Sequence, residues 1–176
     1  MKIPSVAAAL VALGGCQSVQ DHPPLRLAPK VDLERFMGDW YVIANIPTFI
    51  EKGAHNAVES YRLDADGFTI STTFTFRADG FDGEEKRYTP KGTVIDRASN
   101  AVWGMQFVWP LKADYRIVYV ADDYSTTIIG REKRDYAWIM ARKPALPEAE
   151  YRRLAGMLAE QGYDISKLRK VPQRWN

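Results

Sequence analysis

Gly38-Asp39-Trp40-Tyr41 opens the first long run of β-forming residues, and the rest of the chain is arranged around it. The glycine lets the backbone turn sharply just before Trp40. The residues that follow, 41–46, are nearly all β-branched, aromatic or small and apolar, which favours a strand. We interpret Trp40 as the floor of a β-barrel whose later strands enclose a pocket above it. An ordinary core position is the alternative.

Short β-rich segments separated by turn signals follow this opening as far as Arg142. Residues 68–76 show the clearest pattern, because apolar side chains alternate with hydroxylated ones, as in a strand with one buried face. The predicted strands are residues 40–46, 57–63, 68–76, 85–95, 101–109, 115–120, 126–130 and 136–142. Eight short strands at this spacing indicate an all-β protein, either a sandwich or a barrel. We expect an eight-stranded antiparallel up-and-down β-barrel, whose interior can hold one small ligand.

One segment after these strands has helical periodicity. Apolar side chains recur near helical spacing in residues 147–161, and Pro147 and Gly162 suit the two ends. The apolar face is narrow and the charges are mixed, so we expect a C-terminal α-helix packed outside the barrel rather than one lying on a membrane. A helical turn in residues 31–37 and a short final strand in residues 168–171 complete the predicted elements.

The N-terminus has the features of an export signal. Residues 1–15 combine Lys2, a short apolar run and small residues, and they are too short to span a bilayer. Leu13-Gly14-Gly15-Cys16 resembles the lipobox of bacterial lipoproteins, in which the cysteine is acylated. The resemblance implies a lipid anchor on Cys16. A plain secretory signal with an incidental cysteine is the alternative.

Residues 16–30 contain three prolines and no hydrophobic period, so we expect an extended tether leading to one domain, residues 31–176. The residue after the cysteine is Gln17, whereas an aspartate there would resemble the signal that retains lipoproteins at the inner membrane. We therefore expect a lipid-anchored protein of the outer membrane that faces the periplasm.

The composition argues against several functions. The 176 residues include 24 Lys and Arg against 22 Asp and Glu, scattered along the chain, so nucleic-acid binding is not expected. One cysteine allows no disulfide within the chain. The two histidines, His22 and His55, belong to no cluster with metal-ligand spacing, and there is no Gly-x-Ser-x-Gly elbow. We expect no metal, no cofactor and no catalytic residue.

A pocket with apolar walls and a few polar groups is the stronger signal. If Tyr61 faces inward, strand alternation turns Glu59 inward too, where a carboxylate must be paired, hydrated or protonated. Glu59 could bind a ligand head group, satisfy a structural contact, or lie outside if the register differs by one. The residues expected to line the pocket are Glu59, Tyr61, Phe74, Tyr88, Trp103, Met105, Phe107, Tyr119 and Trp138. A solid aromatic core is the alternative.

Three short motifs in order resemble the signature regions of the lipocalins. They are Gly38 with Trp40 at the first strand, Asp122-Asp123-Tyr124 after the sixth, and Arg142 at the end of the eighth. The resemblance implies structural roles for Gly38, Trp40, Asp123, Tyr124 and Arg142. It also implies that the arginine packs across the tryptophan at the closed end, a cation–π contact. Asp122 stands where the family motif has threonine, which leaves that hydroxyl's role unfilled.

Residues 38–44, 134–142 and 162–165, together with the lipobox, resemble most closely the bacterial outer-membrane lipoprotein lipocalins. The resemblance implies a carrier that binds fatty acids or lysophospholipids in the barrel and touches the membrane through its anchor. A homodimer is left open. Two other functions remain as alternatives: an enzyme on the same barrel, acting through Glu59 or Tyr88, and a non-binding envelope scaffold.

Overall fold

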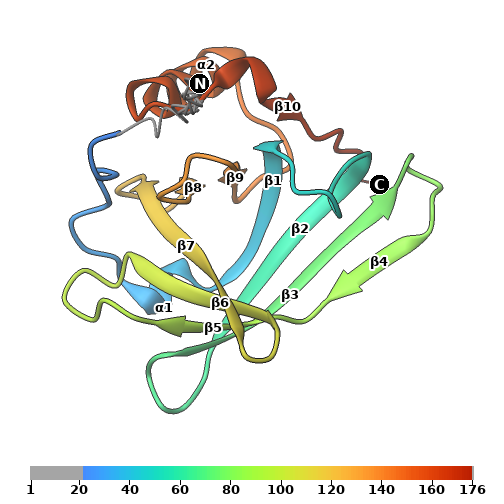
Figure 1. Cartoon of the computed structure of the whole chain (residues 1–176). Helices are drawn as coiled ribbons and strands as arrows, with labels where there is room; N and C mark the ends of the chain where they lie inside the picture. The colour runs from blue at the N-terminus through green and yellow to red at the C-terminus, as the bar shows by residue number, and fades with distance from the viewer. Residues whose placement is uncertain (1–21, 176) are drawn as a thin grey trace, which may run out of the picture.

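The computed structural model describes residues 22–175, and the predicted signal peptide and Cys16 lie outside this range. A ring of strands forms the body of the molecule (Figure 1). The strands are β1 (Gly38–Ile46), β2 (Ala54–Leu63), β3 (Thr69–Ala78), β4 (Glu85–Tyr88), β5 (Lys91–Val94), β6 (Val102–Val108), β7 (Leu111–Val120), β8 (Thr126–Gly130), β9 (Ala137–Ala141) and β10 (Arg169–Lys170). The helices are α1 (Leu33–Phe36) and α2 (Glu148–Glu160), with a 3-10 turn at Ile165–Lys167.

The ring is closed by antiparallel pairing of sequence neighbours. The order is β1-β2-β3-β5-β6-β7-β8-β9, and β9 pairs back with β1, which gives eight positions. Strand four of the prediction is divided at Pro90 into β4 and β5, because proline cannot donate to the ladder. β4 pairs only with β3, and β10 adds to the edge of β1. The predicted eight-stranded barrel is confirmed, and the sandwich is excluded.

The closed end of the barrel is assembled from the signature residues. The Arg142 guanidinium lies 3.8 Å from the centroid of the Trp40 ring, as the resemblance implied. Its nitrogens also donate to the carbonyl oxygens of Asp39, Arg35, Phe36 and Met37 at 2.8–3.1 Å. Gly38 has φ +92°, and a Cβ there would come within 3.4 Å of the guanidinium. The positive φ therefore favours glycine at this position, whereas a Cβ would reach only ordinary contact distance from the arginine.

The second signature region, Asp122-Asp123-Tyr124, fastens α1 to the same end. The Tyr124 hydroxyl accepts a hydrogen bond from the backbone N–H of Asp32 at 2.8 Å. Arg35 lies over the Tyr124 ring at 4.2 Å. The Asp123 carboxylate accepts from the N–H of Ser125 at 2.9 Å, which stabilises the β7–β8 turn. The start of β1 and the ends of β7 and β9 therefore lie together at the closed end of the barrel.

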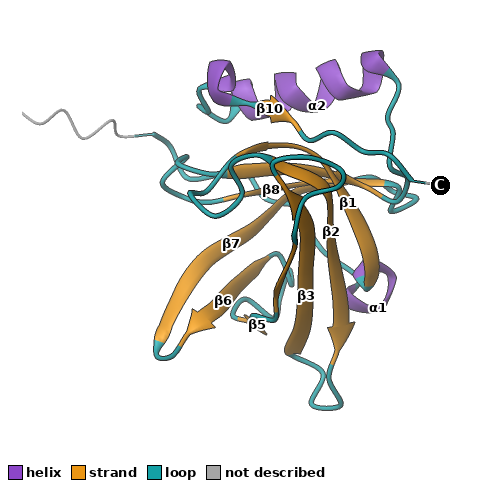
Figure 2. Cartoon of the chain, turned by 90° about the vertical axis from the view of Figure 1, so that its right-hand side faces the viewer, coloured by secondary structure: helices purple, strands orange, loops and turns teal. Residues whose placement is uncertain are grey.

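α2 lies across the outside of the barrel, as predicted (Figure 2). Its buried residues, Leu154 and Leu158, pack against outward-facing side chains of β1, β8 and β9 such as Ile43 and Ile139. No helix within residues 22–175 is long and apolar enough to cross a membrane.

The described part of the expected tether is not detached from the domain. Residues 22–30 form no regular element, but Leu25 and Ala28 are buried. The N–H of Ala28 donates to the carbonyl of Ile117 at 3.0 Å, and Arg134 donates to the carbonyl of Pro23. The prolines predicted an extended backbone, but the two apolar side chains between them hold that backbone against the barrel.

Candidate functional site

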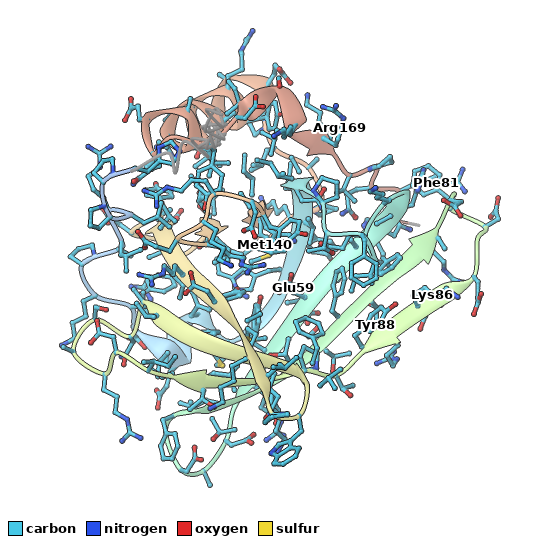
Figure 3. All side chains as sticks on the ribbon, in the orientation of Figure 1. Glu59, Phe81, Lys86, Tyr88, Met140 and Arg169 are labelled. Atoms are coloured by element: carbon cyan, nitrogen blue, oxygen red, sulfur yellow. The ribbon has the colours of Figure 1, made fainter. Side chains whose placement is uncertain are left out.

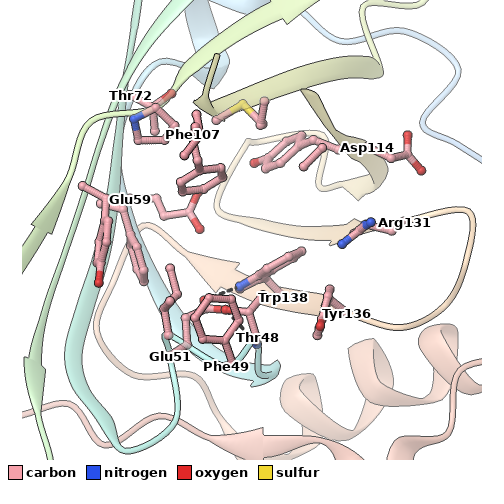
Figure 4. Close-up of a pocket in the computed structure, with 18 of the residues that line it drawn as sticks. Thr48, Phe49, Glu51, Glu59, Thr72, Phe107, Asp114, Arg131, Tyr136 and Trp138 are labelled. Atoms are coloured by element: carbon pink, nitrogen blue, oxygen red, sulfur yellow. Dashed lines mark hydrogen bonds between the residues drawn. The ribbon is translucent and has the colours of Figure 1, made fainter. Parts of the chain in front are cut away.

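The barrel encloses a cavity of about 570 Å³ that opens at the end opposite α1. Such a volume is within the range of small-molecule sites. Six of the residues predicted to line a pocket do so: Glu59, Phe74, Tyr88, Met105, Phe107 and Trp138. Figure 4 shows several of them around the space. The walls of the cavity are mostly apolar. Because this space is open, the barrel is hollow rather than filled by its aromatic side chains.

Two of the predicted lining residues lie beneath the cavity. Trp103 is fully buried, its ring stacks on Tyr115 with centroids 5.2 Å apart, and its indole N–H donates to the Asn100 carbonyl. Tyr61 is buried beside Phe36 and Trp103. Both side chains face inward as predicted, but they belong to the floor rather than to the wall.

Tyr119 is on the opposite face from the one predicted. A β-bulge between Ile117 and Tyr119 interrupts the pairing of β7 with β8. The extra residue shifts the alternation, so Tyr119 joins the outer cluster under α2. Its hydroxyl accepts a hydrogen bond from Arg153 of that helix at 3.1 Å. Tyr119 therefore supports the helix and does not reach the cavity.

Glu59 is the polar group at the bottom of the cavity. Its side chain points into the ring of strands (Figure 3), and the residue is only 9% exposed. The Tyr61 hydroxyl donates to the Glu59 carboxyl group and lies 2.6 Å from the Tyr115 hydroxyl. Burial raises the pKa of Glu59 to about 7, the Tyr61 hydrogen bond opposes the shift, and Glu51 adds to it. Burial also raises the pKa values of Tyr61 and Tyr115.

A second carboxylate, Glu51, is fully engaged near the mouth. It accepts from the indole N–H of Trp138 at 2.7 Å, and from the N–H and hydroxyl of Thr48 at 3.0 and 2.6 Å. Asn45 adds a longer contact of 3.4 Å. This network fixes the β1–β2 loop and the orientation of Trp138, which is its evident role.

The sequence prediction missed most of the lining residues near the mouth. They come from the β1–β2 loop, the start of β7 and the β8–β9 turn: Thr48, Phe49, Ile50, Glu51, Ala113, Asp114, Arg131 and Tyr136. Strand alternation carries no information about loops. A signal was available, since each of these segments adjoins the same end of an up-and-down barrel.

Large apolar side chains project from the mouth into solvent. Trp109 and Phe49 are 83% and 81% exposed, and the remaining members of this apolar rim are Phe107, Val108 and Leu111. Phe49, Phe107 and Val108 also line the cavity, so its apolar surface continues onto the outside. Contiguous exposed apolar surface of this kind marks an interaction site.

Comparison with known proteins agrees with this geometry. The family model of the lipocalin-like domain matches residues 31–173. The chain belongs to the lipocalin family. Among solved structures, insecticyanin from the tobacco hornworm Manduca sexta superposes with a TM-score of 0.67 at 16% identity, covering 88% of this chain and 86% of that one. At this identity the likeness supports the lipocalin fold alone.

Curated relatives extend over most of this lipocalin. Temperature-induced lipocalin-1 of Arabidopsis thaliana is 34% identical, covering 85% of this chain and 83% of its own. The outer membrane lipoprotein Blc of Escherichia coli is 24% identical, and the match covers 97% of both chains. Lipocalin barrels hold one small ligand. The fold, the cavity and these relatives support a role in binding or transporting a small hydrophobic molecule.

Proposed function

We propose that this lipocalin carries single-chain lipids, either fatty acids or lysophospholipids, in its barrel. The observation that supports the proposal is the cavity of about 570 Å³, which is apolar along its walls and open at one end. We propose that the lipid's hydrocarbon chain contacts the six lining residues that were predicted from the sequence. Tyr61 and Trp103 would act below them by holding the floor in place.

The expected affinity follows from the hydrocarbon that the cavity can bury. Each buried methylene contributes about 0.8 kcal/mol, so about ten give roughly 8 kcal/mol before the lipid and the loops are ordered. A net free energy of that size would correspond to a dissociation constant of about 1 μM, so the ordering costs make about 1 μM the tightest binding expected from ten methylenes. Reversible binding of this strength suits a carrier.

We further propose that the protein works at the outer membrane, anchored through Cys16 and facing the periplasm. Relatives named as outer membrane lipoproteins support this location. The apolar rim supports it too, because a mouth surrounded by Trp109, Phe49 and Leu111 suits exchange of lipid with a membrane surface. Cys16 lies outside the described residues, so the anchor is argued from the lipobox.

Mass spectrometry of lipids copurifying with the untagged, folded protein tests this function. We expect one fatty acid or lysophospholipid per chain, removed by extraction and restored on adding the same lipid. A matched variant, Thr72→Trp, places an indole in the cavity wall and should copurify with much less lipid. Absence of lipid from the wild type, together with failure to take up added lipid, would favour a non-binding scaffold.

A further inference from the structure

We propose that the lipid binds with an anionic head group at Arg131, near the mouth, and with its hydrocarbon tail directed down toward Glu59. The inference rests on the proposed lipid binding and adds to it the charge of the head group and the direction of the chain.

Arg131 is the cation among the described residues that line the cavity. Its side chain is only 20% exposed, and Figure 4 shows it directed toward the space bordered by Glu59 and Trp138. The Nε atom is buried and has no hydrogen-bond partner. Because Arg131 lines the cavity, its guanidinium can donate a charge-assisted hydrogen bond to a carboxylate or phosphate oxygen held there.

The neighbouring groups engage Arg131 only loosely. The nearest carboxylate is Asp135, whose oxygen lies 3.5 Å from Nε, beyond a good hydrogen bond. Asp114 accepts from Arg116 at 2.9 Å and from the N–H of Glu132 at 2.7 Å, and it points away from the cavity (Figure 4). The Tyr136 ring lies 5.2 Å from the guanidinium, and the loose ion pair with Asp135 leaves Arg131 able to take a second anionic partner from the cavity.

The register of the strands shows that Glu59 and Arg131 lie at opposite ends of the cavity. Glu59 pairs across β1 and β2 with Trp40, the residue of the barrel floor. Arg131 follows Gly130, the last residue of β8, which pairs with Ala137 at the start of β9. A ligand placed along the axis therefore has Glu59 at the deep end and Arg131 at the open end.

The chemistry of the deep end excludes an anionic head group there. Glu59 already occupies it with a carboxyl group whose charged form burial disfavours. The same burial would disfavour the charge of a carboxylate or phosphate placed there, and the lining cation, Arg131, lies at the other end. A neutral carboxylic acid hydrogen-bonded to Tyr61, in contrast, can border a methyl terminus.

Three twelve-carbon ligands test the head-group assignment by calorimetry: laurate, dodecyl phosphate and dodecanol. Arg131→Gln should weaken binding of the two anions about tenfold to a hundredfold, as loss of a charged hydrogen bond predicts, and leave dodecanol within about twofold. Arg131→Lys should recover part of the loss. The control is Arg62→Gln, which removes an exposed arginine paired with Asp64 near the closed end. The laurate and phosphate arms show whether carboxylate or phosphate is preferred.

Equal loss for all three ligands, or no loss for the anions, would overturn the assignment. Unchanged dodecanol binding shows that the variant retains a folded cavity. If the wild type binds none of the three, the proposed function itself fails, which is a different result.

A separate experiment tests the direction in which the lipid's hydrocarbon chain enters the barrel. Trp40 and Trp103 lie at the floor, and replacing the other three tryptophans with phenylalanine leaves them as the only fluorophores of this type. Stearate brominated near its methyl end should quench them more than stearate brominated near its carboxylate. The reverse order would show that the head group goes in first.

Discussion

Replacing Glu59 with glutamine should remove a loss of stability that the wild-type protein suffers as the pH rises. In the folded protein the pKa of Glu59 is raised from 4.5 to about 7, mainly by burial. The unfolded chain releases this proton near pH 4.5, whereas the folded protein keeps it until about pH 7. Between these values the folded state binds more protons, so stability falls as pH increases, and it levels off above pH 7.

The size of the effect follows from the width of this window. A shift of one pKa unit corresponds to 1.36 kcal/mol, so the separation from 4.5 to about 7 gives about 3 kcal/mol in total. For a domain of this length that amounts to about 6–12 °C in melting temperature. Glutamine keeps an oxygen that can accept from Tyr61 and cannot ionise.

Urea unfolding of the delipidated protein at several pH values from 4 to 8 measures the effect. The difference in unfolding free energy between Glu59→Gln and wild type should shift in favour of the variant by about 3 kcal/mol across this range. Glu34→Gln, which removes an exposed carboxylate on α1, controls for the loss of one negative charge. A difference for Glu59→Gln that stays constant with pH would show that Glu59 ionises normally in the folded barrel.

Three further outcomes are expected. Arg142→Gln should lower the unfolding free energy by at least about 2 kcal/mol, because it removes the contact with Trp40 and hydrogen bonds to backbone carbonyls; a loss below 0.5 kcal/mol in urea unfolding would contradict this. Cys16→Ser should move the protein from the membrane to the soluble fraction in cell fractionation, and unchanged partitioning would argue against the anchor. Trp109→Ser combined with Leu111→Ser should slow lipid transfer to vesicles severalfold while leaving laurate affinity unchanged; transfer at the wild-type rate would show that the apolar rim is not used.

The fold could be predicted because its signals are local and periodic. The alternation in residues 68–76 identifies β3, and the helical spacing after Pro147 identifies α2. The signature motifs predicted the contact between Trp40 and Arg142, which are about a hundred positions apart in the sequence. Periodicity and motif order were sufficient for the barrel and its closed end.

The site was predicted less completely, since alternation tells which face a side chain occupies and not how deep it lies. Trp103 faces inward as expected but lies under the cavity. Tyr119 was assigned to the wrong face because a bulge carries no clear mark in the sequence. Arg131 was missed because it lies in a turn, where strand alternation does not apply. It lines the same cavity as Glu51 only because the barrel closes.

Isothermal titration of oleate into the delipidated protein tests most directly whether the barrel is a hollow that binds lipid. We predict one saturable site with a dissociation constant in the micromolar range, a negative heat-capacity change from apolar burial, and a loss of at least tenfold in affinity for Thr72→Trp. No saturable heat with the wild type, or equal binding by the filled variant, would contradict a ligand inside the barrel.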